Sequence, residues 1–283
     1  MSFDKIGVVG SGTMGNGIAH VFALAGLQVC LVDITTDLLE RALSAITKNL
    51  DRQLKKETIT AAQRQSALAA ITTSTDMAVF SGCSLVVEAV TESRDLKKKI
   101  FAGLEDVVSP DCILASNTST ISLSELAGQL RSPRRFIGMH FMNPAPLMQL
   151  VEVITAIQTA EATTAAIVDL AVRIGKTAVV VRDSPGFVLN RVLIPMINEA
   201  VCALDSGIAD AAAIDSCMKL GANHPIGPLA LADLIGLDVC LTIMEVLFAD
   251  FGDPKYRPSP LLRRMVAAHM LGRKSGTGFF TYD

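Results

Sequence analysis

A histidine and a glutamate in this chain have the residue types and spacing of a general base and the acid that orients it. His140 falls at the end of a predicted strand, and Glu152 lies on the strand that follows. A carboxylate can accept the proton of one imidazole nitrogen, which leaves the other nitrogen to take a proton from a substrate. A lone histidine after a strand is more often structural, and an acid between valines is often a surface group. The pair is therefore a candidate base that needs a second signal.

The second signal is a glycine-rich turn, Gly10–Gly15, between a predicted strand and an apolar helix. Glycines at this spacing allow a tight turn, close approach of the backbone to a pyrophosphate, and close packing of helix on strand. Asp33 ends the next strand, where its carboxylate can accept the ribose hydroxyls and repel a 2′-phosphate. The pattern predicts a site that favours NAD over NADP; a nucleotide-free turn is the alternative. Joined to a histidine base, it indicates hydride transfer from a carbon whose hydroxyl loses a proton.

Two further polar side chains are candidates for holding ligands. Ser119 follows a predicted strand, at the edge where open α/β sheets bind their ligands. It can bond a nicotinamide amide or a substrate hydroxyl, or cap the next helix, a task that Ser122 or Ser124 can also perform. Asn190 lies in an apolar helix of the second half, where it either holds a carbonyl oxygen or is a satisfied core amide.

A helix predicted over residues 37–56 has an apolar face and, opposite it, a basic face. The basic face consists of Arg41, Lys48, Arg52, Lys55 and Lys56. A solvated surface is the ordinary explanation of such a face. The helix also follows the strand that ends at Asp33. The alternative is therefore that its C-terminal end binds an anionic part of a ligand, such as the phosphates of coenzyme A.

The elements that must position these residues are strands alternating with helices. We predict strands over 5–9, 29–33, 84–89, 112–116, 135–139, 150–154 and 177–181, which indicate a Rossmann-like, doubly wound, mostly parallel sheet. Beyond the segment 183–186 (DSPG) the periodicity becomes helical. The fold class is thus α/β, with a nucleotide-binding domain over 1–184 and a smaller all-α domain over 185–283.

Composition excludes several classes of function. The chain has 283 residues, half of them hydrophobic, and a net charge of -3, which argues against a disordered chain and against broad attraction to nucleic acid. The apolar stretch 234–248 contains two acids and is shorter than the roughly 20 residues of a membrane span. No secretory signal pattern opens the chain, and the cysteines are scattered. We expect a cytoplasmic protein without a membrane, nucleic-acid or metal site.

The chain resembles the L-3-hydroxyacyl-CoA dehydrogenase family, and is most similar to its short bacterial 3-hydroxybutyryl-CoA dehydrogenases. The likeness covers essentially the whole chain. It rests on the segments VVGSGTMG, VVEAVTES, SNTSTISLSELA, GMHFMNPAPLMQLVEVI, DSPGFVLNR, MKLGANHPIGPLALADLIGLD and GRKSGTGFF. Several long motifs in the family's order are far more specific than one glycine-rich turn.

The resemblance implies a role for each candidate residue. His140 is then the catalytic base, Glu152 orients it, and Ser119 and Asn190 hold the substrate. The implied NAD contacts are Gly10, Gly12, Thr13, Met14, Gly15, Asp33, Glu92, Lys97, Asn117, Ser119, Asn143 and Lys274. Asn49, Arg52 and Lys56 are the implied contacts to the coenzyme A moiety.

The implied reaction interconverts an (S)-3-hydroxyacyl-CoA and a 3-oxoacyl-CoA with NAD, without a metal, as a step of fatty acid metabolism. The resemblance also implies a homodimer formed through the C-terminal domain. Alternatives are a gulonate-type sugar-acid dehydrogenase of the same superfamily, a non-catalytic NAD-binding structural protein, and a piece of a multifunctional β-oxidation protein. Acyl chain length, direction and pathway stay open.

Overall fold

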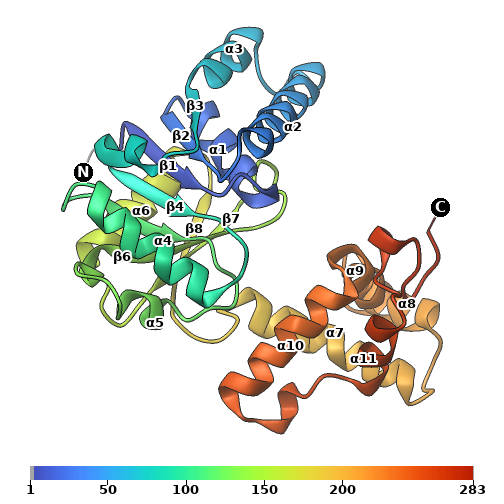
Figure 1. The fold of residues 1–283 in the computed structure, drawn as a ribbon. Helices are drawn as coiled ribbons and strands as arrows, with labels where there is room; N and C mark the ends of the chain where they lie inside the picture. The colour runs from blue at the N-terminus through green and yellow to red at the C-terminus, as the bar shows by residue number, and fades with distance from the viewer. Residues whose placement is uncertain (1–2, 283) are drawn as a thin grey trace. The chain divides into compact units, whose positions relative to one another are not determined.

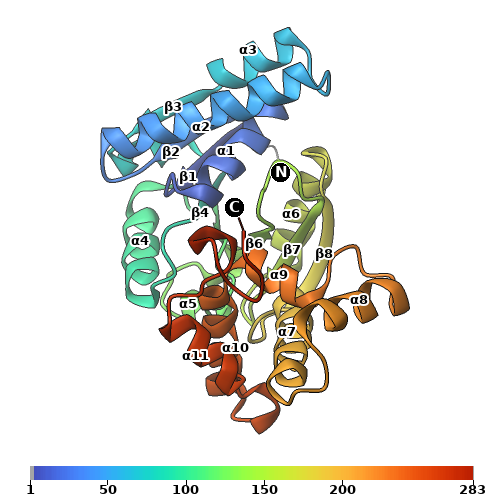
Figure 2. The ribbon, with the colours of Figure 1, turned by 90° about the vertical axis from the view of Figure 1, so that its right-hand side faces the viewer.

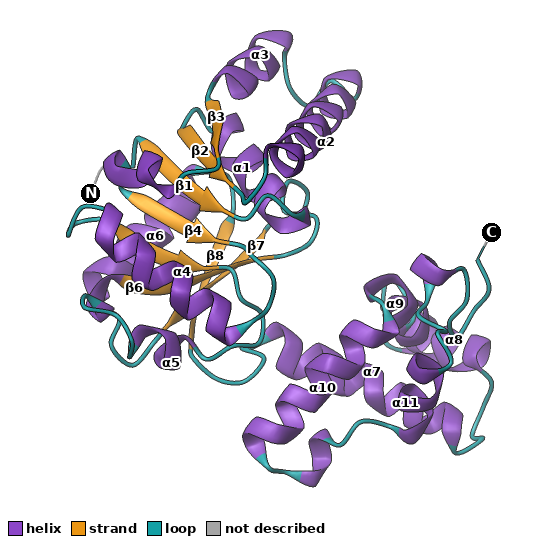
Figure 3. Cartoon of the chain, in the orientation of Figure 1, coloured by secondary structure: helices purple, strands orange, loops and turns teal. Residues whose placement is uncertain are grey.

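The structure, a computed structural model, describes residues 3–282 as two compact units that divide between Asp183 and Ser184. The first unit contains one eight-stranded sheet with the order β3-β2-β1-β4-β5-β6-β7-β8. Its strands are β1 (Lys5–Val9), β2 (Gln28–Val32), β3 (Ile71–Ser74), β4 (Leu85–Glu88), β5 (Ile113–Ser116), β6 (Phe136–Phe141), β7 (Leu150–Thr155) and β8 (Thr177–Arg182). All neighbours run parallel except β6 and β7, which are antiparallel. Figure 3 shows the sheet with helices on both sides, which confirms the predicted Rossmann-like fold class.

Helices cover both faces of this sheet (Figure 1). One face packs against α1 (Thr13–Leu24), α2 (Thr36–Lys55), α3 (Ala61–Ala69) and α6 (Glu161–Arg173), whose apolar side chains share one core with the strands. The other face carries α4 (Arg94–Val107), α5 (Leu123–Ala127) and the short 3-10 turns η1 (Met77–Gly82) and η2 (Pro133–Arg135). There Phe101 of α4 meets Phe136 of β6 edge to face, with ring centroids 4.8 Å apart.

Helix α2 is amphipathic, as its sequence predicts. Thr35 caps its N-terminus, and its buried residues are Leu39, Ala42, Ile46 and Leu50. Burying each of the larger side chains contributes about 2 kcal/mol to folding. Arg41, Lys48, Arg52, Lys55 and Lys56 are exposed. Figure 2 shows α2 with α3 alongside it at the end of the sheet that carries β3.

The sequence analysis did not predict α3 or β3. Helix α3 begins with a capping box, in which Thr60 accepts from the backbone N–H of Gln63 and the Gln63 side chain accepts from the backbone N–H of Thr60. This local signal was available, but α3 buries only Ala67 and so lacks a clear apolar stripe. Strand β3 (ITTS) is a short edge strand without fully buried residues, which gives little hydrophobic pattern.

The second unit is helical. It contains α7 (Leu189–Asp205), α8 (Ala211–Gly221), α9 (Pro228–Ile235), α10 (Leu237–Phe251) and α11 (Pro260–Ala267), with the short turns η3 (Pro254–Tyr256) and η4 (Arg273–Ser275). Its core gathers apolar side chains of α7, α9, α10 and α11. Buried Asp233 accepts hydrogen bonds from the backbone N–H groups of Phe279 and Phe280 and from the hydroxyl of Tyr282, which ties the last described residues to α9. Across residues 3–282, none of the helices has the length and hydropathy to cross a membrane.

Candidate active site

The single antiparallel strand pair of the sheet brings His140 and Glu152 together. In the register of β6 and β7, His140 lies directly opposite Glu152. Nδ1 of His140 is 2.8 Å from Oε2 of Glu152, and the two residues are only 7% and 1% exposed. Strand alternation sends Val151 and Val153 to the opposite face, where they join the core. The register therefore decides what the sequence left open, namely which face of β7 meets the histidine.

This contact determines what the imidazole can do. A carboxylate at Nδ1 favours the tautomer that carries its proton on Nδ1, so Nε2 has the lone pair that can accept a proton. The same carboxylate stabilises the imidazolium that forms after that transfer. Both groups are nearly excluded from water, which makes their charge interaction stronger than that of a surface pair. The geometry is that of an oriented general base.

Asn117 fixes the backbone beside the histidine. Its Oδ1 accepts a hydrogen bond of 2.9 Å from the N–H of Phe141, the residue after His140. Its own N–H donates to the carbonyl of Glu88 at 2.8 Å. Asn117 thus joins the carboxyl ends of β4, β5 and β6, at the edge where parallel sheets bind their ligands.

Glu92 organises the segment that contains Ser119. Its Oε1 accepts from the backbone N–H groups of Ser119 (2.9 Å) and Thr120 (3.0 Å) and from the Thr118 hydroxyl. Partial burial raises the pKa of Glu92, but the charge of Lys97 and these hydrogen bonds outweigh it, so that the pKa lies below its usual range. An ionised Glu92 therefore holds the turn in which the Ser119 side chain is presented.

A buried ion pair that the sequence analysis missed supports this turn. Lys97 is 1% exposed, and its Nζ lies 2.6 Å from Oε1 of Glu88 and 3.2 Å from Oε2 of Glu92. Glu88 is fully buried and also accepts from the Ser116 hydroxyl at 2.7 Å. The available signal was an acid that ends a valine-rich buried strand, because such a charge must be paired. Lys97, which the resemblance assigns to NAD, has an ammonium that two carboxylates already hold.

The glycine-rich turn after β1 has the geometry that a dinucleotide pyrophosphate needs. A Cβ on Gly15 would lie 1.7 Å from the carbonyl oxygen of Gly10, so only glycine lets the helix approach the turn. Gly10 itself has φ +89°, which also favours glycine. No side chain caps the start of α1, and nothing lies within 4 Å of the place where a Cβ of Gly12 would be. The start of α1 thus has no side-chain cap and has room beside Gly12, as anion binding at a helix N-terminus requires.

Asp33 lies against the same turn. Its Oδ2 accepts from the backbone N–H and from the hydroxyl of Ser11, at 2.6 and 2.7 Å, and its Oδ1 accepts from the N–H of Ile34. The carboxylate therefore lies beside the turn, where the adenosine ribose of a dinucleotide would follow its pyrophosphate. These residues together fit NAD.

The remaining predicted residues lie elsewhere in the two units. Arg52 and Lys56 are exposed and Asn49 is half-buried, all near the C-terminal end of α2. Asn143 follows β6 in the connection to β7. Asn190, on α7, is 9% exposed, and Lys274 donates to Asp238 at 2.6 Å; both belong to the second unit. Their part in a site with His140 stays a prediction.

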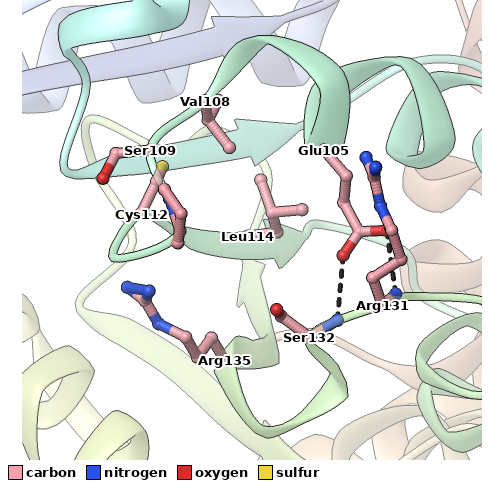
Figure 4. A pocket seen from close by; sticks show the side chains of 9 residues that line it. Glu105, Val108, Ser109, Cys112, Leu114, Arg131, Ser132 and Arg135 are labelled. Atoms are coloured by element: carbon pink, nitrogen blue, oxygen red, sulfur yellow. Dashed lines mark hydrogen bonds and ion pairs between the residues drawn. The ribbon is translucent and has the colours of Figure 1, made fainter.

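A hollow of about 240 Å³ lies at the amino ends of β5 and β6, away from these residues (Figure 4). Glu105 in its wall accepts from the backbone N–H groups of Arg131 and Ser132 at 2.9 and 3.0 Å. Burial raises the pKa of the Cys112 thiol to about 12, so this cysteine is not an activated nucleophile. None of the predicted site residues lines this hollow. Among residues 3–282, no group of three or more His, Cys, Asp or Glu side chains is arranged to hold a metal ion.

Comparison with known proteins gives matches over both units. Residues 5–184 match the family described as 3-hydroxyacyl-CoA dehydrogenase, NAD binding domain, and residues 186–282 match 3-hydroxyacyl-CoA dehydrogenase, C-terminal domain. A probable 3-hydroxybutyryl-CoA dehydrogenase of Deinococcus radiodurans is 51% identical over 98% of this chain and 100% of its own. A 3-hydroxybutyryl-CoA dehydrogenase of Bradyrhizobium diazoefficiens is 49% identical over 98% of this chain and 95% of its own. The crystal structure of (S)-3-hydroxybutyryl-CoA dehydrogenase from Ralstonia eutropha covers 100% of both chains, with a TM-score of 0.97 and 51% identity.

Proposed function

The chain belongs to the 3-hydroxyacyl-CoA dehydrogenase family and is an NAD-dependent oxidoreductase, and we propose that it interconverts (S)-3-hydroxybutyryl-CoA and acetoacetyl-CoA. The observation that carries the proposal is the 2.8 Å contact between His140 and Glu152 in the unit that also contains the dinucleotide turn. The family match favours this reaction over gulonate-type sugar-acid oxidation and over a non-catalytic role.

His140 acts as the general base in the oxidative direction. Its Nε2 takes the proton of the C3 hydroxyl, and the charge that forms on the imidazole is stabilised by Glu152 through Nδ1. Bound NAD supplies the hydride acceptor for C3. In the reductive direction the imidazolium returns the proton to the C3 oxygen. Ser119 and Asn190 orient the reacting oxygen and the thioester carbonyl, which holds the reacting atoms in line.

The cofactor and the coenzyme A moiety are bound by different residues in this proposal. The turn Gly10–Gly15 and the start of α1 bind the pyrophosphate, and Asp33 binds the ribose. Further contacts come from Glu92, Lys97, Asn117, Asn143 and Lys274. Asn49, Arg52 and Lys56 bind the phosphates of coenzyme A, which the exposure of the two basic residues supports.

The second unit serves as the dimerisation domain in this proposal. Large apolar side chains are exposed on it, among them Ile208 (78%), Leu220 (87%) and Val192 (66%), and burial against a second copy would remove them from water. A cytoplasmic location also belongs to the proposal. It is supported by the free state of all six cysteines, since cysteines stay reduced in that compartment.

The test is NADH oxidation by the purified protein with acetoacetyl-CoA, beside the same concentration of free acetoacetate. We expect turnover that requires the coenzyme A group and is lost in His140→Ala. The variant should still bind NADH, as measured by its fluorescence, because His140 is not part of the dinucleotide turn. Wild-type protein that binds NADH but turns over gulonate and not acetoacetyl-CoA would contradict the proposal.

A further inference from the structure

Lys176 is a buried ammonium that the reaction above does not use. It precedes β8 and is 8% exposed. Its Nζ donates to the carbonyl oxygens of Ala145 and Met148, both at 2.7 Å. Burial lowers the pKa of Lys176, and no ion pair of the described residues includes it. A buried ammonium without a carboxylate partner depends on the acceptors that it bonds, which here are these two carbonyls.

The two carbonyls belong to the β6–β7 loop, which we define as residues 142–149. This loop joins the strand of His140 to the strand of Glu152 and carries Asn143. Its middle is a tight turn, because the N–H groups of Leu147 and Met148 both donate to the carbonyl of Pro144 at 3.0 Å. Lys176 bonds both sides of that turn and so fixes its position against the start of β8.

The other side of the β6–β7 loop rests on the helix of the glycine-rich turn. A Cβ on Gly17 of α1 would lie 3.2 Å from Cβ of Ala145 and 3.4 Å from Cδ of Pro146. The loop is therefore seated between α1, whose N-terminus faces the proposed pyrophosphate site, and Lys176. A displacement of the loop away from Lys176 would move Asn143 and the end of β6 relative to α1.

We propose that Lys176 is a positioning residue for the reaction: it clamps the β6–β7 loop so that Asn143 and His140 keep their places relative to the cofactor. The inference rests on the proposed function. Lysine suits the task because one ammonium can donate to several carbonyls that converge from different directions, and charge-assisted bonds are stronger than neutral ones. Without it, the buried carbonyl of Ala145 and the part-buried carbonyl of Met148 lose a donor.

A hollow of about 250 Å³ beside Lys176 allows a direct test by chemical rescue. Its walls include Lys176, His20, Gln53, Pro146 and Gln149. Lys176→Ala leaves room for the missing part of the side chain, which has the size of propylammonium, and the hollow gives a small amine a path to the carbonyls. Lys176→Met fills the space of the lysine stem without a donor, so the same amine has no place to bind.

The experiment measures kcat and KM for acetoacetyl-CoA in both variants, with and without propylammonium. Because small misplacements of reacting groups are costly, we expect kcat to fall about 10- to 100-fold in each variant. KM should stay near the wild-type value, because Lys176 bonds the carbonyls of the β6–β7 loop, and none of the residues assigned to coenzyme A, Asn49, Arg52 and Lys56, lines the hollow beside it. Propylammonium should restore most of the lost kcat in Lys176→Ala and none in Lys176→Met. Tetramethylammonium, which carries charge without an N–H donor, should restore neither.

Lys5→Met is the matched control, since Lys5 donates to one carbonyl, that of Val79, at the amino end of β1. It should leave kcat unchanged. Melting curves followed by circular dichroism separate an effect on activity from an effect on folding. Lys176 variants with a lower melting temperature but wild-type kcat would overturn the inference. Restoration of kcat by tetramethylammonium would also overturn it. If Lys176→Ala does not fold, wild-type kcat in Lys176→Met overturns it. Absence of turnover in the wild-type protein would instead contradict the proposed function.

Discussion

Replacing Glu152 by glutamine tests the proposed base most directly, because it removes one charge and little else. Glutamine has nearly the shape of glutamate, so the strand pair β6–β7 should keep its register. The new amide can donate a hydrogen bond to Nδ1 of His140, where the carboxylate could only accept one. That contact favours the tautomer with its proton on Nε2, which is the wrong one for taking a proton from substrate. Any imidazolium that forms also loses its counter-charge.

The magnitude follows from the 2.8 Å separation of Nδ1 and Oε2. Unit charges at that distance interact by about 6 kcal/mol at an effective dielectric constant of about 20. Part of this stabilisation is already present as a hydrogen bond to the neutral imidazole, so roughly half is gained only when the histidine is protonated in the transition state. A loss of about 3 kcal/mol corresponds to a kcat roughly 100- to 200-fold lower.

The assay is acetoacetyl-CoA reduction followed by NADH absorbance, with kcat and KM determined across pH. We expect Glu152→Gln to lower kcat and kcat/KM together, because the lost interaction is made in the transition state. Glu161→Gln, at an exposed position in the first turn of α6, is the control and should behave as wild type. A kcat for Glu152→Gln within a few-fold of wild type would refute the oriented-base mechanism.

Further predictions concern the turn, the ribose contact and acid stability. Gly15→Ala would place its Cβ 1.7 Å from the carbonyl of Gly10, so we expect loss of NADH binding by fluorescence titration or loss of the folded state; unchanged binding would contradict the close approach. Asp33→Ala should narrow the preference of kcat/KM for NADH over NADPH by about tenfold or more, because the carboxylate no longer repels a 2′-phosphate; an unchanged ratio would remove Asp33 from the ribose site. The pKa of Glu92 is lower in the folded protein than in the unfolded chain, where a glutamate has a pKa of about 4.3. The ionised carboxylate therefore stabilises the fold at pH values above the unfolded-state pKa. This stabilisation is lost as the pH falls through the folded-state pKa. Urea unfolding between neutral pH and pH ~3 should therefore show a weaker loss of stability on acidification in Glu92→Gln than in wild type, and equal slopes would refute this.

The sequence predicted those parts of the fold that have strong local signals. The glycine spacing and Asp33 indicate the first βαβ unit because turn geometry restricts the residue types there. Alternating apolar strands and helices predict the mostly parallel sheet, and the structure confirms it. Strand β6 extends to Phe141, so His140 lies within the strand and not at its predicted end. Propensity alone does not set such boundaries, since the β7 partner determines how far β6 remains paired.

Contacts between residues far apart in the sequence could not be predicted from the sequence pattern. Alternation along β7 gives two faces, but only the pairing with β6 shows that the face of Glu152 is that of His140. The pairing of Glu88 with Lys97 likewise depends on how α4 packs beside β4. The resemblance named Glu92 and Lys97 for the cofactor but could not show that they also bind each other. Lys176 gave no signal at all, because a lysine just before a strand does not show which backbone carbonyls its ammonium will bond.

The antiparallel pairing of β6 and β7 makes this site sensitive to chain length more than to composition. A one-residue insertion or deletion in the β6–β7 loop, with the ladder otherwise kept, would slide β7 by one position. Val151 or Val153 would then face His140, and the carboxylate of Glu152 would enter the apolar core on the other face. Substitutions in the loop leave the number of its residues unchanged. A single codon gained or lost in frame would instead separate His140 from Glu152 without replacing either residue. We therefore expect natural and laboratory variants of this chain to tolerate changes of residue in this segment far better than changes in its length.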